Sequence, residues 1–162
     1  MKLALASVVA IGVAVGVSLP AASPPTTPAS TPAPVAPARA ADAPRPTVLA
    51  RSAGGHFFAV AEVNGEPIRF LVDTGASTVA LSEADARRAR IAFDPSRYAP
   101  VGRGASGVVN GQEVTVGDIV LDGKKGEGLR GVVMQGADVS LLGQNYLRRL
   151  DVSIKGDVMT LR

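Results

Sequence analysis

The chain has 162 residues, a formal net charge of +3 at pH 7 and 46% hydrophobic residues, and this length allows a single modest core. It contains no cysteine, which excludes a disulfide framework, a thiolate nucleophile and a lipoprotein attachment site. Aromatic residues are only 4% of the chain and no basic run is interleaved with them, so nucleic-acid binding is not expected.

An apolar segment opens the chain. Residues 3–19 contain no charged residue and follow Lys2. As a helix they would span about 26 Å, close to the thickness of a bilayer's hydrocarbon core and longer than the usual apolar region of a signal peptide. A membrane anchor and a cleaved signal sequence both remain open, and we favour the anchor because no good cleavage site follows. Lys2 then predicts a cytoplasmic amino terminus, with the rest of the chain across the membrane.

Residues 20–46 form a second segment, rich in Pro, Ala, Ser and Thr. They hold nine of the twelve prolines. Such a composition cannot bury apolar surface and favours extended polyproline conformations, so we expect a disordered linker. A proline-rich ligand for a partner domain is the alternative.

The third segment, residues 47–162, carries the pattern of a folded domain. Residues 56–63 and 68–72 are β-prone, and Asn64-Gly65 between them favours a tight hairpin turn. The second strand leads directly into Asp73, one acid between two apolar runs. Because no cation adjoins this carboxylate in sequence, the pattern indicates a chemical role more than an ordinary polar turn.

The residues after Asp73 suit such a role. Gly75 lets the main chain approach a neighbouring group closely, and Thr74 offers a hydroxyl that could brace the loop. Ala76 and Ser77 are small enough to leave the carboxylate accessible. We therefore take Asp73 as the candidate catalytic residue and residues 74–77 as its loop.

His56 is the only histidine of the chain. In the predicted hairpin it could lie near Asp73, but a residue in this position more often only starts a strand. We interpret it as structural. A Ser-His-Asp triad is rejected, because neither the order nor the spacing of the residues argues for one.

A short strand is predicted over residues 78–81, followed by a helix that Ser82 caps and that reaches about Arg90. Three arginines near the carboxyl end of this helix suit its dipole, and we interpret them as a solvated face: Arg87, Arg88 and Arg90.

A glycine-rich mobile hairpin is predicted between residues 100 and 122. The spacing favours residues 104–107 as its tip, whereas Asn110-Gly111 is the better turn sequence, so both remain open. The candidate residues are Arg103, Gly104, Ala105, Ser106, Gly107, Asn110 and Gly111. A phosphate loop around Arg103 is discounted because no helix and no Gly-Lys-Ser follows. Lys124-Lys125 is expected to be a solvated loop.

The remaining elements are a strand over residues 129–134, the apolar segment Leu141-Leu142-Gly143, and a short helix over 144–150. Both leucines are expected to be buried, and Gly143 permits tight packing. Residues 151–154 and 158–162 are predicted to pair across a turn.

With these elements in view, the sequence resembles the retropepsin-like aspartic proteases of clan AA, most closely their bacterial single-lobed, membrane-anchored group. The resemblance covers residues 54–162 and implies a mainly all-β fold, a small closed barrel with one or two short helices. Arg90 departs from the family pattern, which often has Gly there. The matching segments are Gly55-His56-Phe57, Val63-Asn64-Gly65, residues 70–77, Leu81-Ser82, Asp85-Ala86-Arg87 and residues 138–143.

The resemblance also implies an activity, an aspartic endopeptidase with Asp73 as the catalytic residue. The glycine-rich hairpin would be the flap over the substrate, and Leu141, Leu142 and Gly143 would support the catalytic loop from beneath. Activating a water molecule requires two carboxylates that share a proton. Because this chain holds one such loop, we expect a homodimer that pairs Asp73 with its copy.

The expected partners are therefore a second copy, a peptide or protein substrate, and the membrane through residues 3–19, with no nucleic acid, cofactor or metal. The expected location is the inner membrane with the catalytic domain in the periplasm, or export if the amino-terminal segment is cleaved. The alternative function is a catalytically inert periplasmic protein-binding module on the same fold.

Overall fold

The structure is a computed structural model that describes residues 43–104 and 107–162. The predictions for residues 1–19, and for the linker up to residue 42, lie outside the described residues. Within the described ranges, neither α-helix is long and apolar enough to cross a membrane.

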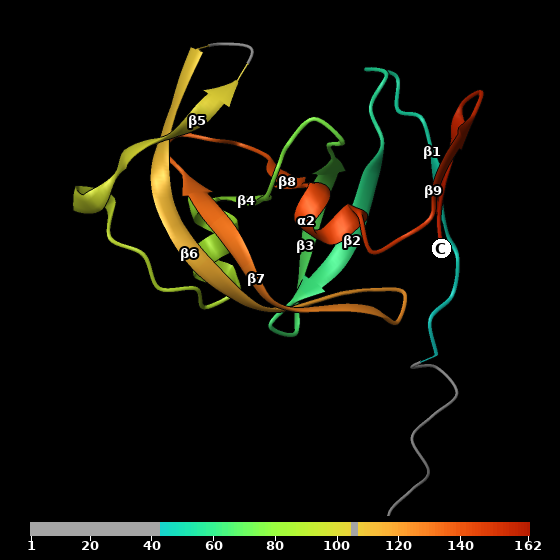
Figure 1. Cartoon of the computed structure of the whole chain (residues 1–162), viewed down its shortest axis with the longest axis horizontal. Helices are drawn as coiled ribbons and strands as arrows, with labels where there is room; N and C mark the ends of the chain where they lie inside the picture. The colour runs from blue at the N-terminus through green and yellow to red at the C-terminus, as the bar shows by residue number, and fades with distance from the viewer. Residues whose placement is uncertain (1–42, 105–106) are drawn as a thin grey trace, which may run out of the picture. The chain divides into compact units, whose positions relative to one another are not determined.

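The larger sheet forms a closed barrel (Figure 1). Its strands lie in the order β2-β3-β8-β4-β7-β6-β5, and a further pairing between β2 and β6 closes the ring. This confirms the predicted mainly β, closed fold. The strands are β2 (Phe58–Val63), β3 (Glu66–Val72), β4 (Val79–Ser82), β5 (Ala99–Gly104), β6 (Gly107–Leu121), β7 (Lys124–Met134) and β8 (Ser140–Leu142).

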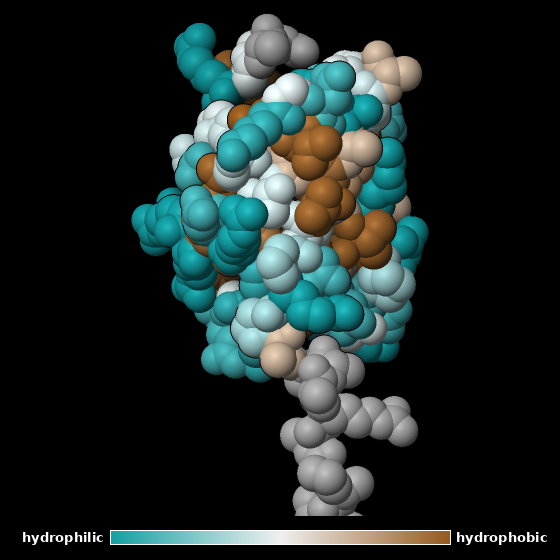
Figure 2. Space-filling model, turned by 90° about the vertical axis from the view of Figure 1, so that its right-hand side faces the viewer, coloured by the Kyte–Doolittle hydropathy of each residue, from teal (hydrophilic) through white to brown (hydrophobic). Residues whose placement is uncertain are grey.

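A second sheet joins the two ends of the described domain (Figure 1). It contains β1 (Thr47–Ala50), β9 (Val152–Lys155) and β10 (Val158–Leu161) in the order β1-β10-β9, and it confirms the predicted pairing of the last two strands. Figure 2 looks onto the side where β1 and β9 lie, and apolar side chains gather there. The exposed valines Val48 and Val158 belong to this sheet.

The hairpin that leads to Asp73 forms as predicted. Asn64 and Gly65 both have positive φ, 51° and 83°, which is the tight turn that matches the twist of paired strands. The alternating residues that face the barrel are buried: Ala59, Ala61, Val63, Ile68, Phe70 and Val72. The period-two pattern therefore fixes which face of the hairpin enters the core.

Helix α1 (Glu83–Arg88) follows β4, and Ser82 caps it by accepting a hydrogen bond from Asp85 N at 3.2 Å. The helix ends two residues earlier than predicted. Arg90, just beyond it, has φ 56°, in the left-handed region that favours glycine. The glycine that the family often has there would fit this conformation without strain. The only other short helical elements of the described chain are a 3₁₀ turn (Pro95–Arg97) and α2 (Gln144–Leu147), which is shorter than predicted.

The prediction of a solvated loop at Lys124-Lys125 is wrong, because both residues lie in β7 and only Lys125 is exposed. The turn lies at Asp122 and Gly123, and Lys124 is already the first residue of β7 with 6% of its surface exposed. Its Nζ donates to Arg45 O and to Thr47 Oγ1, and burial lowers the pKa of Lys124. Successive strand residues point to opposite faces, so one lysine is buried while Lys125 is exposed.

Tyr146 anchors α2 on the barrel. It is 1% exposed, and its hydroxyl donates to Lys124 O at 2.6 Å. Burial raises the pKa of Tyr146 to about 12. Gly126 makes room for the ring, because a Cβ there would lie 2.9 Å from Tyr146 Cδ2. The start of β7 and the start of α2 are therefore held together.

Candidate active site

Asp73 lies where the chain leaves β3 and must cross another strand before it enters β4. That strand is β8, which pairs in parallel with β3 and antiparallel with β4. The Asp73 loop, residues 73–78, therefore passes over the end of β8. Asp73 N donates to Leu142 O at 3.1 Å, which ties the start of the loop to this strand.

Gly143 lies against the backbone of the Asp73 loop. A Cβ at this position would lie 2.2 Å from Thr78 O and 2.9 Å from Ala76 O, so no side chain fits. Leu142 is fully buried, but Leu141 is only half-buried. The prediction that both leucines are buried is wrong for Leu141, because alternation along β8 turns its side chain to the opposite face of the sheet.

Gln144 is the first of two residues that the sequence analysis did not place in the site. Its backbone N–H donates to Ala76 O at 2.8 Å, and its side-chain Nε2 donates to Thr74 O at 3.0 Å. Its position directly after Gly143 was the available signal, since the free N–H groups of a helix's first turn need acceptors. The first turn of α2 therefore binds the carbonyls of the Asp73 loop.

Asn145 is the second such residue. Its backbone N–H donates to Ser77 O at 3.1 Å, its Oδ1 accepts from Val79 N at 2.9 Å, and its Nδ2 donates to Arg130 O at 2.6 Å. One side chain thus links the end of the Asp73 loop to β7. Together with Gln144 it fixes the loop on the barrel.

The Asp73 carboxylate is half-buried and turned into its own loop. Oδ1 accepts a hydrogen bond from Gly75 N at 2.8 Å, and a Cβ on Gly75 would lie 3.2 Å from the same oxygen. Among the described residues, none of the ion pairs involves Asp73, and no group of three possible metal ligands occurs. The carboxylate is oriented by backbone and has no fixed counter-ion.

A cleft of about 220 Å³ adjoins this loop. Residues 75–78 form one wall, and residues 101–103 and Val109 of the β5–β6 hairpin form the other. Val132 and Met134 of β7 also line it. The loop and the predicted flap therefore do lie on opposite sides of one cleft.

The tip of the hairpin lies at residues 104–107. Gly104 pairs with Gly107, while Ala105 and Ser106 between them lie outside the described residues. The alternative tip at Asn110-Gly111 is wrong, since both residues lie inside β6 and pair with β5. Gly111 is needed there for packing, because a Cβ would lie 2.4 Å from Val133 O. Gly111 therefore marks a close contact between β6 and β7, not a turn.

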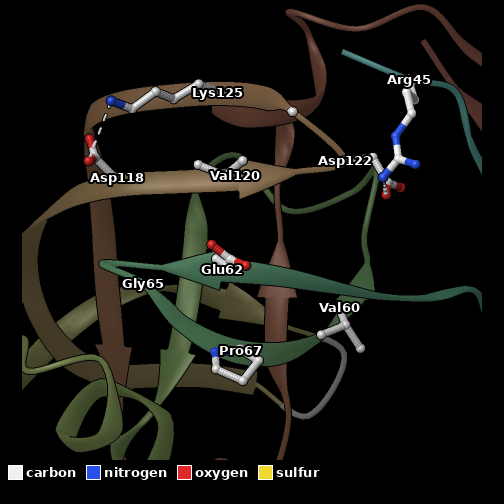
Figure 3. A pocket seen from close by; sticks show the side chains of 10 residues that line it. Arg45, Val60, Glu62, Gly65, Pro67, Asp118, Val120, Asp122 and Lys125 are labelled. Carbon is white, nitrogen blue, oxygen red and sulfur yellow. Dashed lines mark ion pairs between the residues drawn. The ribbon is translucent and has the colours of Figure 1, made fainter. Parts of the chain in front are cut away.

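A larger hollow of about 660 Å³ lies on the outer face of β2, β3 and β6 and contains no residue of the Asp73 loop (Figure 3). Ion pairs stand at its two ends, Asp118 with Lys125 at 3.5 Å and Arg45 with Asp122 at 3.6 Å. Its charges are therefore largely paired. The smaller cleft, beside the oriented carboxylate, is therefore the candidate active site, although the hollow is larger.

His56 lies two residues before the start of β2 and is exposed. Its backbone N–H donates to Ser52 Oγ at 3.1 Å, and its ring meets Phe58 edge-on with centroids 6.5 Å apart. Among the described residues, no hydrogen bond is made by its imidazole. The backbone of His56 is thus part of a turn, whereas its side chain is free for contacts outside the fold.

Comparison with known proteins agrees with this geometry. The model of the family described as gag-polyprotein putative aspartyl protease matches residues 59–149. A crystal structure of a retropepsin-like aspartic protease from Rickettsia conorii is 33% identical, with a TM-score of 0.59 and coverage of 72% of this chain and 89% of that one.

Two curated relatives are uncharacterized proteins. RP867 from Rickettsia prowazekii (strain Madrid E) is 35% identical over 103 residues, which is 63% of this chain and 44% of the relative. A protein in the cobV 5' region of a Sinorhizobium sp. is 33% identical over 123 residues, 71% of this chain and 51% of the relative. The chain therefore spans about half the length of these relatives.

The matched range contains the Asp73 loop, both strands of the β5–β6 hairpin and the first turn of α2, and it is more than half of the chain. The loop and the hairpin form the walls of the cleft, and α2 binds the loop. The chain therefore belongs to the gag-polyprotein putative aspartyl protease family, and its domain has the retropepsin-like aspartic protease fold.

Proposed function

We propose that this protein is an aspartic endopeptidase, which hydrolyses peptide bonds with a water molecule activated between the Asp73 carboxylates of two copies. The observation that carries the proposal is the oriented carboxylate. Gly75 N holds Asp73 Oδ1 on a loop that β8 and α2 fix from below, and this loop forms one wall of a cleft. General acid–base catalysis requires such a preorganised group beside a substrate site.

The second carboxylate comes from a second copy in this proposal. One carboxylate must accept a proton from water while another donates one to the scissile amide, and two adjacent carboxyls that share a proton provide both. The sequence contains Asp-Thr-Gly once. A twofold homodimer would pair Asp73 with its copy. Thr74 is exposed beside it, so its hydroxyl is available to brace the two loops across the axis.

The cleft suits a polypeptide in extended form. Its walls carry small residues, among them Gly75, Ala76 and Gly102, so the backbone of a substrate can approach the backbone of the protein. The β5–β6 hairpin would act as the flap, closing over the bound chain and excluding water. We therefore expect unstructured segments of proteins as substrates.

Replacement of the candidate catalytic residue tests the proposal most directly. Asp73→Asn should abolish pepstatin-sensitive cleavage of an unstructured protein and leave the circular dichroism spectrum unchanged, because the amide keeps the size of the side chain but cannot act as a base. Asp138→Asn, at an exposed aspartate in the turn before β8, is the matched control and should keep full activity. Cleavage by folded Asp73→Asn protein would overturn the proposal.

Dilution tests the requirement for two copies. Activity of the purified domain should fall faster than linearly over a hundredfold dilution, and its pH profile should be bell-shaped on the acidic side of neutrality. Sedimentation at the same concentrations gives the species present. Constant specific activity from a species that sediments as a monomer would exclude the shared-proton mechanism. A folded dimer that binds peptides but never cleaves them would instead indicate the inert binding module.

We also propose that residues 3–19 hold the protein in the inner membrane with the catalytic domain in the periplasm. The support is the uncharged apolar run behind Lys2. Two copies anchored in one membrane would meet at a higher effective concentration. A reporter fused after Arg162 should be active in the periplasm, and activity confined to the cytoplasm would refute this location.

A further inference from the structure

A row of side chains on the outer face of the β2–β3 hairpin ends beside Asp73. Val72 N donates to Phe57 O at 2.9 Å, so these two residues are direct neighbours across the hairpin, and both are buried. Because side chains alternate along paired strands, the residues directly beyond this pair, His56 and Asp73, belong to the outer face. The only histidine of the chain thus flanks the candidate catalytic residue.

The row continues away from Asp73 through Phe58 to Arg69. The imidazole of His56 meets the edge of the Phe58 ring at an interplanar angle of 80°. The guanidinium of Arg69 lies 3.6 Å from the centroid of the same ring. His56 and Arg69 are exposed, and Phe58 between them is half-buried. We call His56, Phe58 and Arg69 the basic ledge.

No ion pair of the described residues neutralises the basic ledge. Arg51, in the turn before His56, is already paired with Asp157, with its Nε 3.1 Å from Asp157 Oδ1. None of the ion pairs among residues 43–104 and 107–162 involves His56 or Arg69. Asp73 is the carboxylate that the hairpin register sets opposite His56, and it takes part in none of these ion pairs either. The ledge is therefore complementary to an anion.

We propose that the basic ledge recognises acidic side chains near the scissile bond of the substrate, with His56 as a specificity-determining residue. The inference rests on the proposed protease function. The cleft lies on the β4 side of Asp73, along residues 75–78, whereas His56 lies on the β2 side. A substrate that runs over Asp73 leaves the cleft and meets the ledge. A carboxylate there would accept hydrogen bonds from His56 and Arg69, and bonds between ionised groups are the stronger kind.

Two peptides that differ only in Glu or Gln at the positions flanking the scissile bond test this. The wild-type protein should cleave the Glu peptide with roughly tenfold higher kcat/KM, the size expected for one additional charge-assisted hydrogen bond. In His56→Gln the ratio of the two kcat/KM values should fall towards one. Adding Arg69→Gln to His56→Gln should bring the ratio still closer to one. Arg97→Gln removes an exposed cation elsewhere and should leave the ratio unchanged.

The pH dependence of the ratio separates recognition from a structural effect. Histidine changes its charge between about pH 5 and 8, whereas a glutamate in a peptide stays ionised over that range. The preference for Glu should therefore grow from pH 8 to pH 5 in the wild-type protein and stay constant in His56→Gln. The other charged groups at this end of the hairpin are Arg51, Arg69, Asp73 and Asp157, and they are the same in the wild-type protein and in His56→Gln. A change with pH that only the wild-type protein shows therefore comes from His56.

Binding of the same labelled peptides to Asp73→Asn separates this inference from the proposed function. If no peptide is cleaved but Asp73→Asn prefers the Glu peptide and loses the preference with His56→Gln, the ledge stands and the protease proposal fails. If both peptides are cleaved equally, the protease stands and the ledge is overturned. A Glu preference that survives in both ledge variants, or no binding and no cleavage of either peptide, also overturns the inference.

Discussion

One wall of the cleft, the Asp73 loop, is held from below by β8 and α2, whereas the tip of the other wall, the β5–β6 hairpin, pairs with itself. The carbonyls of Thr74, Ala76 and Ser77 all accept hydrogen bonds from Gln144 or Asn145. In the hairpin, Gly104 and Gly107 pair only with each other, and the register shifts between Pro100 and Gly102. The candidate catalytic carboxylate therefore lies on the wall that other elements hold in place, whereas the tip of the other wall has few fixed contacts.

Burial follows the same division. Behind the loop lie fully buried residues such as Leu142 and Val79. Near the hairpin tip the residues of β5 and the first residues of β6 are mostly exposed, and Val108 is 57% exposed. A segment with few buried contacts opens at low free-energy cost, which a flap requires and a catalytic loop does not tolerate.

The same substitution in the two walls should give the largest contrast. In Gly143→Ala the new methyl group would lie 2.2 Å from the backbone oxygen of Thr78, so we expect a loss of about 3 kcal/mol in the free energy of unfolding. Displacement of the loop by about 1 Å should lower kcat at least about 100-fold. In Gly104→Ala the nearest atom is a side-chain carbon at 3.4 Å, so stability should change by less than about 1 kcal/mol.

Urea denaturation and peptide cleavage of both variants check this prediction. Gly104→Ala is the matched control, because it adds the same methyl group at an open position and should keep the secondary structure of the wild-type protein. Equal stability of the two variants would show that the loop can shift to accept a side chain at Gly143.

Removal of one amide side chain from each wall gives a smaller contrast. Asn145→Ala leaves the N–H of Val79, a fully buried residue, without its acceptor, which should cost about 1–3 kcal/mol of the free energy of unfolding. We also expect reduced kcat, because Val79, which directly follows the Asp73 loop, and Arg130 lose their link through this side chain. Asn110→Ala, at an exposed strand position of the hairpin, should change stability by less than about 0.5 kcal/mol. Thermal unfolding of the pair tests this, and an unchanged Tm for Asn145→Ala would contradict it.

Tyr146→Phe tests the hydrogen bond that holds α2, and through α2 the Asp73 loop, on β7. This variant has the smallest expected effect. Loss of the hydroxyl that donates to Lys124 O should cost about 1 kcal/mol at pH 7. The pKa of Tyr146 is raised to about 12 in the folded protein, so its stabilising contribution is complete below about pH 10, the ordinary value for tyrosine, and is lost as the pH rises through 12.

The difference in unfolding free energy between wild type and Tyr146→Phe should therefore decline between about pH 10 and 12. Urea titrations from pH 7 upwards measure it. A difference that stays constant across this range would show that the hydroxyl does not ionise at a raised pKa.

Local sequence was enough to predict the hairpin, the turn that carries Asp73 and the helix cap. Asn64-Gly65 takes a turn conformation that its own residues prefer, and Ser82 bonds to a group three residues away. Asp73 stood out as a candidate because burying an unpaired carboxylate between apolar strands costs free energy. These features depend on neighbours within a few positions, so the sequence alone determines them.

Only the tertiary structure decided the parts that depend on distant partners. Lys124 is buried because it meets Thr47, 77 residues away in the chain, and Gly111 is required by the backbone of β7. Gln144 and Asn145 became part of the site because β8 inserts between β3 and β4 and brings the start of α2 beneath the Asp73 loop. Local preference sets the shape of a turn, but long-range strand pairing decides which backbone groups are left for a side chain to bind.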